Sequence, residues 1–114
     1  MEHIGAGLAA LGVIGPGIGI GILAGMSSSA IGRNPDAAGQ IRGLAIILAA
    51  FAEGLGVLGP GIGIGILAGM SSAAIGRNPD AAAQIRGLAI ILAAFAEGLG
   101  VLAIVVGLLA IFIK

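Results

Sequence analysis

The sequence predicts an all-α membrane protein, in which long transmembrane helices are joined by short polar turns. Of the 114 residues, 59% are hydrophobic and another 23 are glycines, which leaves too few polar residues to cover a soluble globule. The five Lys or Arg and five Asp or Glu residues cancel to a net charge of zero, which excludes a nucleic-acid binder. Most of the charged residues fall in two short clusters, so the stretches between the clusters are apolar enough for lipid.

An internal repeat organises the chain. Residues 15–58 recur as residues 59–102 at an offset of 44, and differ only where Ser29 becomes Ala73 and Gly39 becomes Ala83. We therefore interpret residues 1–114 as a single transmembrane domain with an internal repeat. Removal of one 44-residue copy leaves 70 residues that have the pattern of one helical hairpin.

The two polar clusters are the predicted turns. Each contains Arg-Asn-Pro-Asp, at residues 33–36 and 77–80. The residue before a proline is biased away from the helical region, whereas proline itself and a following acid favour a helix start. The pattern predicts new helices near Pro35 and Pro79, and apolar segments at residues 4–32, 38–76 and 82–113. Each segment exceeds the roughly 20 residues that span a bilayer.

The middle segment allows two topologies, because Gly59-Pro60-Gly61 is either part of a long helix or a turn. The same letters occur at residues 15–17, where a turn would leave only about 14 residues before it and 16 after it. We therefore prefer three long helices, since proline is tolerated inside membrane helices. This topology puts the two polar turns on opposite membrane faces and Glu53 at mid-bilayer depth, and it gives the positive-inside rule no basis for orientation. Four helices would put both turns on one face.

Glycines recur in the segment before each turn. At a spacing of four residues they line a helix face and allow close helix packing in lipid. The predicted packing residues are Gly17, Gly19, Gly21 and Gly25, with Gly61, Gly63, Gly65 and Gly69. A dinucleotide-binding interpretation of this stretch fails, because no strand or βαβ pattern surrounds it. So many glycines predict a helix that has close neighbours on both flanks, as in a ring.

Glu53 and Glu97 are the only ionisable groups that are far from both a turn and a chain terminus, and both occur in the run LAIILAAFAEGLGVL. A charge at mid-bilayer is costly, so we expect these carboxyl groups to be protonated in lipid and to release the proton where water is offered. Their neighbours supply no side-chain oxygen for a hard cation such as Na⁺. The sequence therefore predicts proton binding at both residues. A permanently neutral, structural Glu is the alternative.

Other chemistry has little support in the sequence. The chain has no Cys, and its single His3 has no second ligand nearby, so we expect no metal site and no cofactor. We expect no catalysis of bond making or breaking.

Taken together, GPGIGIGILAG, the Arg-x-Pro-Asp turn and the acid in AFAEGLGVL resemble the c subunit of F-type ATP synthases. The resemblance implies a homo-oligomeric rotor ring in a bacterial-type inner membrane, with Glu53 and Glu97 as the ion-binding carboxylates. It also implies the a subunit of the stator and the central stalk as partners. The residues implied to contact the stalk are Arg33, Asn34 and Pro35, with their copies Arg77, Asn78 and Pro79. Sodium-coupled members carry Gln in the glycine stripe and a hydroxyl residue after the acid, whereas this chain has Ile20 and Ile64, and Gly54 and Gly98.

The resulting functional hypothesis is a proton-translocating rotor-ring subunit that couples proton flow to ring rotation. The duplication departs from the family pattern, because its seam at Leu58-Gly59 joins half of one family helix to half of another. Two alternatives therefore stay open. One is a structural or engineered helical ring that does not translocate protons. The other is a small proton transporter built from inverted repeats, which the three-helix topology would favour.

Overall fold

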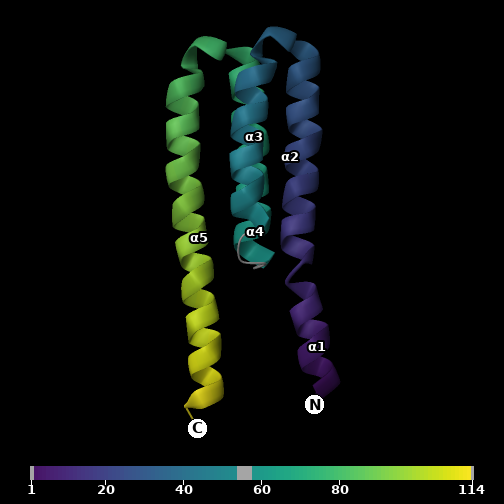
Figure 1. Ribbon diagram of the computed structural model, residues 1–114, viewed down its shortest axis with the longest axis vertical. Helices are drawn as coiled ribbons and strands as arrows, with labels where there is room; N and C mark the ends of the chain where they lie inside the picture. Colours follow the sequence, from purple (N-terminus) through teal and green to yellow (C-terminus); the bar gives the residue numbers. More distant parts are fainter. Residues whose placement is uncertain (1, 54–57, 114) are drawn as a thin grey trace.

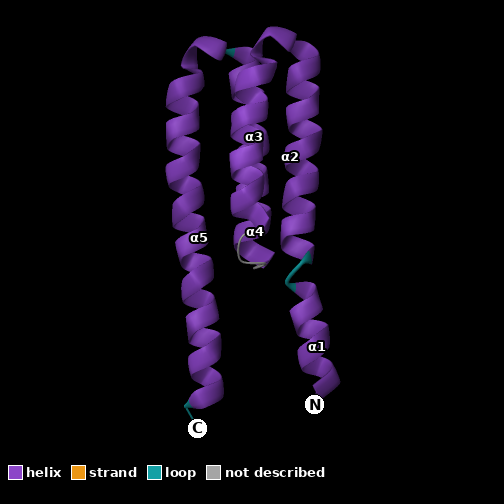
Figure 2. Cartoon of the chain, viewed as in Figure 1, coloured by secondary structure: helices purple, strands orange, loops and turns teal. Residues whose placement is uncertain are grey.

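A computed structural model describes residues 2–53 and 58–113, and every regular element in this part of the chain is a helix (Figures 1 and 2). The elements are α1 (Glu2–Leu11), α2 (Ile14–Arg33), η1 (Pro35–Ala37), α3 (Ala38–Glu53), α4 (Leu58–Arg77), η2 (Pro79–Ala81) and α5 (Ala82–Phe112). The 3₁₀ turns η1 and η2 occupy the two predicted polar turns. The predicted fold class, helical and joined by polar turns, is confirmed.

Within the described residues, three stretches are long and apolar enough to cross a membrane: Ile14–Arg33, Leu58–Arg77 and Pro79–Phe112. They are not the three helices that we expected. The preferred topology was wrong, because the described helices α3 and α4 pack against each other, which two halves of one long helix over residues 38–76 could not do. These two helices pack side by side, so the chain reverses direction between them.

The reversal places both polar turns at the same end of the molecule, with the chain termini at the other end (Figure 1). The Asn34 side chain confirms this arrangement, because its Nδ2 donates a 3.0 Å hydrogen bond to the carbonyl oxygen of Gly76 beside the second turn. The structure thus has the placement of the turns that the four-helix alternative predicted, with both at one end. An inverted-repeat transporter loses its structural basis, because it requires the two turns on opposite faces.

Two prolines explain where the helices begin. Pro16 and Pro60 are each the third residue of their helix, α2 and α4. The first N–H groups of a helix have no partner within the helix, so a proline at this position costs no hydrogen bond. If the helix extended further toward the N-terminus, the proline ring would clash with the carbonyl group of the residue four positions earlier. Before Pro16 the chain only bends at Gly12–Val13, and α1 continues roughly in line with α2 (Figure 2). The same helix start thus follows a bend in one repeat and a reversal in the other.

The helices pack in two layers, with α2 and α4 in one and α3 and α5 in the other. The contact between α2 and α4 is the most extensive, and α3 and α5 also pack against α4. Small and aliphatic side chains fill the space between the layers, with Ile41, Leu44 and Leu48 of α3 and Ile64 and Ile75 of α4 fully buried.

Alpha helices rise about 1.5 Å per residue, so the 16 residues of α3 extend only about 24 Å. That is less than the roughly 30 Å of a bilayer core. Helix α1 and the C-terminal half of α5 extend well beyond the ends of α3 and α4 (Figure 1). Residues 101–113 of α5 and its C-terminal end are accordingly all exposed. The described parts of α3 and α4 thus end well short of the two chain termini.

Candidate carboxylate site

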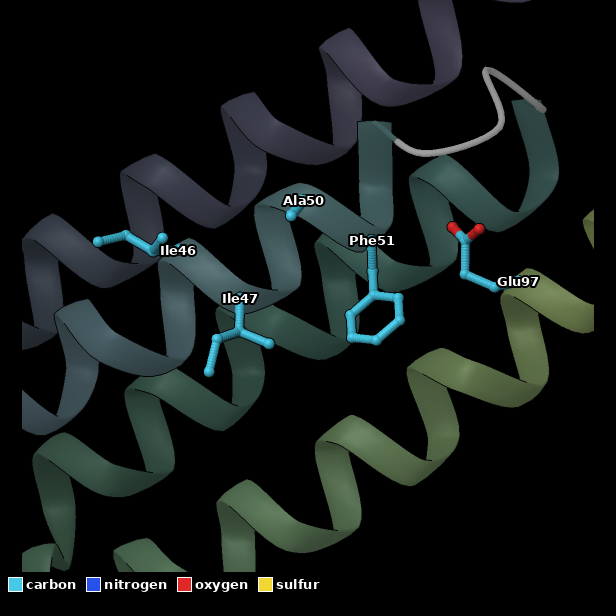
Figure 3. A pocket seen from close by; sticks show the side chains of 5 residues that line it. All are labelled: Ile46, Ile47, Ala50, Phe51 and Glu97. Carbon is cyan, nitrogen blue, oxygen red and sulfur yellow. The ribbon is translucent and has the colours of Figure 1, made fainter.

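Glu97 lies near the middle of α5, beside the ends of α3 and α4 that are remote from the polar turns (Figure 1). Its side chain points away from the α5 ribbon toward the neighbouring helices (Figure 3). There it lines an open cavity of about 480 Å³ together with Ile46, Ile47, Ala50 and Phe51 of α3. Glu97 is the one ionisable residue among these five, so its carboxyl group faces an apolar wall.

Glu53 has a different environment, although it occupies the equivalent position of the repeat. It is the last residue of α3 and is exposed, whereas Glu97 is half-buried. Our expectation that both copies share one mid-helix environment was wrong. Each carboxylate still follows its own turn by the same number of residues, so the two lie at a similar depth. The two carboxyl groups therefore differ in the residues that surround them and not in depth.

The predicted packing glycines separate into two groups. A Cβ atom on Gly19 or Gly65 would collide with the backbone of the other helix, and one on Gly61 would lie 2.7 Å from the nitrogen of Pro16. Gly69 contacts the Met26 side chain, and its Cβ would lie 2.5 Å from the sulfur atom. These four glycines therefore permit the close approach of α2 and α4.

The other predicted packing glycines face open space in a single chain. Among the described residues, no atom outside the adjoining turns of the same helix lies within 4 Å of the position that a Cβ would take on Gly17, Gly21, Gly25 or Gly63. The two groups lie on different helix faces. The Cβ position of Gly19 faces α4, whereas those of Gly17, Gly21 and Gly25 on the same helix do not.

The predicted stalk-contact residues gather at the turn end. Asn34, which donates a hydrogen bond to the Gly76 carbonyl oxygen, is half-buried, and so is Pro79. The exposed residues are Arg33, Pro35, Arg77 and Asn78. Arg33 Nη1 donates to Ser29 Oγ at 2.6 Å, which holds that guanidinium group against its own helix. The turn end is therefore a polar surface with exposed arginine side chains.

Sequence reasoning missed the polar contacts that join the two repeats. Ser27 Oγ donates to Ser72 Oγ at 3.0 Å between α2 and α4, and both residues are buried. Arg86 Nη2 donates to the carbonyl oxygen of Gln40 at 3.4 Å between α5 and α3. The cavity wall of Ile46, Ile47, Ala50 and Phe51 was missed as well. These four residues precede Glu53 and recur at spacings of three and four, which indicates a shared helix face. The spacing does not indicate that this face meets the carboxyl group of Glu97.

Comparison with known proteins decides the family. The sequence model of the ATP synthase C subunit matches this chain twice, at residues 4–59 and 49–110. The chain belongs to the ATP synthase C-subunit family. This membership and the apolar helices make it an integral membrane protein, as the sequence predicts.

Curated relatives carry the same family name. The ATP synthase c subunit of Clostridium acetobutylicum is 49% identical over 53 residues, which cover 46% of this chain and 65% of that protein. The c subunit of Dehalococcoides mccartyi is 56% identical over 54 residues, which cover 46% of this chain and 71% of that protein. The chloroplastic c subunit of Ostreococcus tauri is 53% identical over 51 residues, covering 44% of this chain and 62% of that protein. The alignments thus span about two thirds of each relative.

Proposed function

We propose that this chain is a proton-carrying component of an ATP synthase rotor ring, with Glu53 and Glu97 as the proton-binding groups. The observation that carries the proposal is the position of Glu97. It is a carboxyl group in an apolar cavity, on a helix whose only other charged residue is Arg86, near the turn. An intramembrane acid in such surroundings is expected to be functional.

The apolar cavity favours the protonated form of the carboxyl group. Ile46, Ile47 and Phe51 offer no hydrogen-bond partner and no opposite charge, so a carboxylate here would be poorly solvated. A neutral acid can move past lipid, and it loses its proton where water or a fixed positive charge becomes available. In the family, an arginine of the a subunit supplies that charge.

Coupling follows from the requirement that a proton crosses only while it is bound to the ring. A charge that crosses the membrane potential releases about 2.3 kcal/mol per 100 mV. If protons enter and leave by separate paths, this free energy drives rotation of the ring. In this proposal the chain makes and breaks no covalent bond of a substrate.

The turn end faces the cytoplasm in this proposal. Arg33, Arg42, Arg77 and Arg86 all belong to the segments next to the two turns, which lie at one end of the molecule (Figure 1). The positive-inside rule assigns such an end to the cytoplasmic side. The exposed Arg33 and Arg77 side chains there are suited to contact the central stalk, in the plasma membrane of a bacterial-type cell.

A hydrophobic carbodiimide tests the proton-binding role, because it modifies protonated carboxyl groups in lipid. Cleavage after arginine separates the two sites, since Glu53 falls in peptide 43–77 and Glu97 in peptide 87–114. We expect labelling of Glu97 that falls as the pH rises and that millimolar Na⁺ leaves unchanged. Protection by Na⁺ would contradict the assignment of H⁺.

The variants Glu53→Gln and Glu97→Gln separate a proton carrier from a purely structural ring. Both variants are expected to assemble, because glutamine keeps the size of the side chain. Proton flux through vesicles that contain the complete ATP synthase should be lost in the double variant. Unchanged flux would favour the structural ring.

A further inference from the structure

The two repeats differ at two positions, and one of these differences lies one helical turn before an arginine of the turn end. Ser29 of the first repeat corresponds to Ala73 of the second. Ser29 precedes Arg33 by four residues, and Ala73 precedes Arg77 by four residues. Side chains at this spacing are neighbours on a helix surface. The first repeat therefore offers its arginine a hydroxyl group, and the second repeat offers a methyl group.

The hydroxyl group of Ser29 holds Arg33 against its own helix. Arg33 Nη1 donates to Ser29 Oγ at 2.6 Å, and a hydrogen bond from a charged donor is stronger than one between neutral groups. Both residues line an open groove of about 250 Å³, to which α4 contributes Ala73. The Arg77 side chain makes no hydrogen bond with the described residues, and alanine at residue 73 provides no acceptor.

The two arginines are otherwise placed alike. Arg33 is the last residue of α2 and Arg77 is the last residue of α4, and both are exposed. Each therefore has the same favourable interaction with the C-terminal end of its helix dipole. The residues that follow the differing position are identical, AIGRNPD at residues 30–36 and again at residues 74–80. The serine is thus the local sequence difference that distinguishes the two arginines.

The heights of the arginines indicate which partner each can reach. Arg33 and Arg77 lie at the tip of the molecule, where α2 and α4 end at the turns (Figure 1). Arg42 and Arg86 are each the fifth residue of the next helix, about 6 Å below its start at 1.5 Å per residue. The lower pair is therefore closer to lipid headgroups, and the tip pair is better placed for a protein that docks on the turns. These four arginines outnumber the two aspartates of the turns, so a complementary protein surface carries carboxylates.

From these observations we infer that the two turns of one chain are not equivalent toward the central stalk. Arg77 pairs with a carboxylate of the stalk, and Ser29 is a positioning residue that keeps Arg33 on α2. The inference rests on the proposed function for the identity of the partner. A carboxylate that pairs with Arg33 has to displace the Ser29 hydroxyl group, whereas pairing with Arg77 displaces no hydrogen bond of the described chain.

Arginine modification tests the positioning role in the purified chain, without any partner. The probe is p-hydroxyphenylglyoxal, which reacts with accessible guanidinium groups, and fragment-ion mass spectrometry gives a rate for each arginine. Arg77 should react roughly two- to five-fold faster than Arg33, the effect of one exposed hydrogen bond. Ser29→Ala should raise the rate at Arg33 to that at Arg77, and Ala73→Ser should lower the rate at Arg77.

Ser28→Ala is the matched control for these rates. Ser28 is exposed on the same helix, and its side chain makes no hydrogen bond with the described residues, so its removal should leave both rates unchanged. A rate at Arg33 that Ser29→Ala leaves unchanged would overturn the positioning role.

Proton pumping driven by ATP, in vesicles that contain the complete ATP synthase, tests the partner. Arg77→Ala should lower the pumping rate roughly two-fold or more below that of Arg33→Ala. The exchange variant Ser29→Ala/Ala73→Ser should reverse this order, because it moves the serine to the other repeat. Equal losses in the two arginine variants would overturn the non-equivalence of the turns.

The lipid composition of the vesicles separates the stalk from the membrane as the partner of Arg77. An order of the variants that is the same with and without anionic lipid supports the stalk. An order that disappears in vesicles of phosphatidylcholine alone would assign Arg77 to lipid headgroups and overturn the inference. Failure of the proposed function would show differently, as loss of carbodiimide labelling at Glu97 in the unaltered chain.

Discussion

Ser27 and Ser72 form a buried hydrogen bond, Oγ to Oγ at 3.0 Å, between α2 and α4. Neither serine is the repeat copy of the other, because the copy of Ser27 is Ser71 and the copy of Ser72 is Ser28. Identical sequences therefore pack here through different faces. Contacts between non-equivalent positions also join the glycines, the turns and the walls of the carboxylate cavity.

Replacement of either serine of this pair should destabilise the α2–α4 contact. Ser27→Ala or Ser72→Ala leaves the other hydroxyl group buried without its partner, at a cost of roughly 0.5–2 kcal/mol in a membrane protein. Ser28→Ala is the matched control, since Ser28 is exposed within the chain. Unfolding of the purified, dissociated chain in a denaturing detergent measures the difference. Equal stability of all three variants would contradict a contribution from this bond.

Leucine at two repeat-related glycines should have different effects. Gly65→Leu drives a side chain into the backbone of Gly19 and should cost about 3 kcal/mol or more, so that the helices of a single chain separate. A Cβ atom at Gly21 meets no neighbouring helix in the described part of the chain, so Gly21→Leu should preserve the fold while it blocks assembly. Helix content and oligomer size, measured on the same samples, distinguish the two results. A monomeric, unfolded Gly21→Leu would show that its face is packed within the chain.

Both polar turns should be accessible from one side of the membrane. Cysteines placed singly at Asp36 and Asp80, which are exposed in the turns, should react with an impermeant thiol reagent from the same side of oriented vesicles. A cysteine at Ile113, at the opposite end of the molecule, serves as the control and should react only from the other side. Labelling of Asp36→Cys and Asp80→Cys from opposite sides would restore the three-helix topology.

The two phenylalanines should each control a different carboxylate. Phe51→Ala widens the Glu97 cavity, so carbodiimide should label peptide 87–114 several-fold faster. In the assembled protein Phe95→Ala should instead accelerate labelling of peptide 43–77, which contains Glu53. Mass spectrometry of the two peptides gives both rates from one digest. Faster labelling of Glu97 in Phe95→Ala and not in Phe51→Ala would contradict the assignment of the cavity wall.

The sequence by itself determined the helical membrane class, the positions of the polar turns and the resemblance to the ATP synthase c subunit. These properties depend on local composition: long apolar runs, Asn-Pro-Asp at the turns and a single acid in the apolar run that follows each turn. The carboxylates Glu53 and Glu97 were also identified from the sequence, because an ionisable residue far from any turn is conspicuous in an apolar segment.

Only the tertiary structure decided where the chain reverses and what surrounds each carboxylate. The glycine and proline residues that begin α2 and α4 are nearly the same, yet the chain bends at Gly12–Val13 and reverses between Glu53 and Leu58. Local preferences permit both outcomes, since proline breaks a helix without fixing the direction that the chain takes next. The reversal is the arrangement that buries Ile41, Leu44 and Leu48 of α3 against the neighbouring helices. Packing between distant residues thus makes two copies of one sequence unequal, because it gives Glu97 a cavity while Glu53 is exposed.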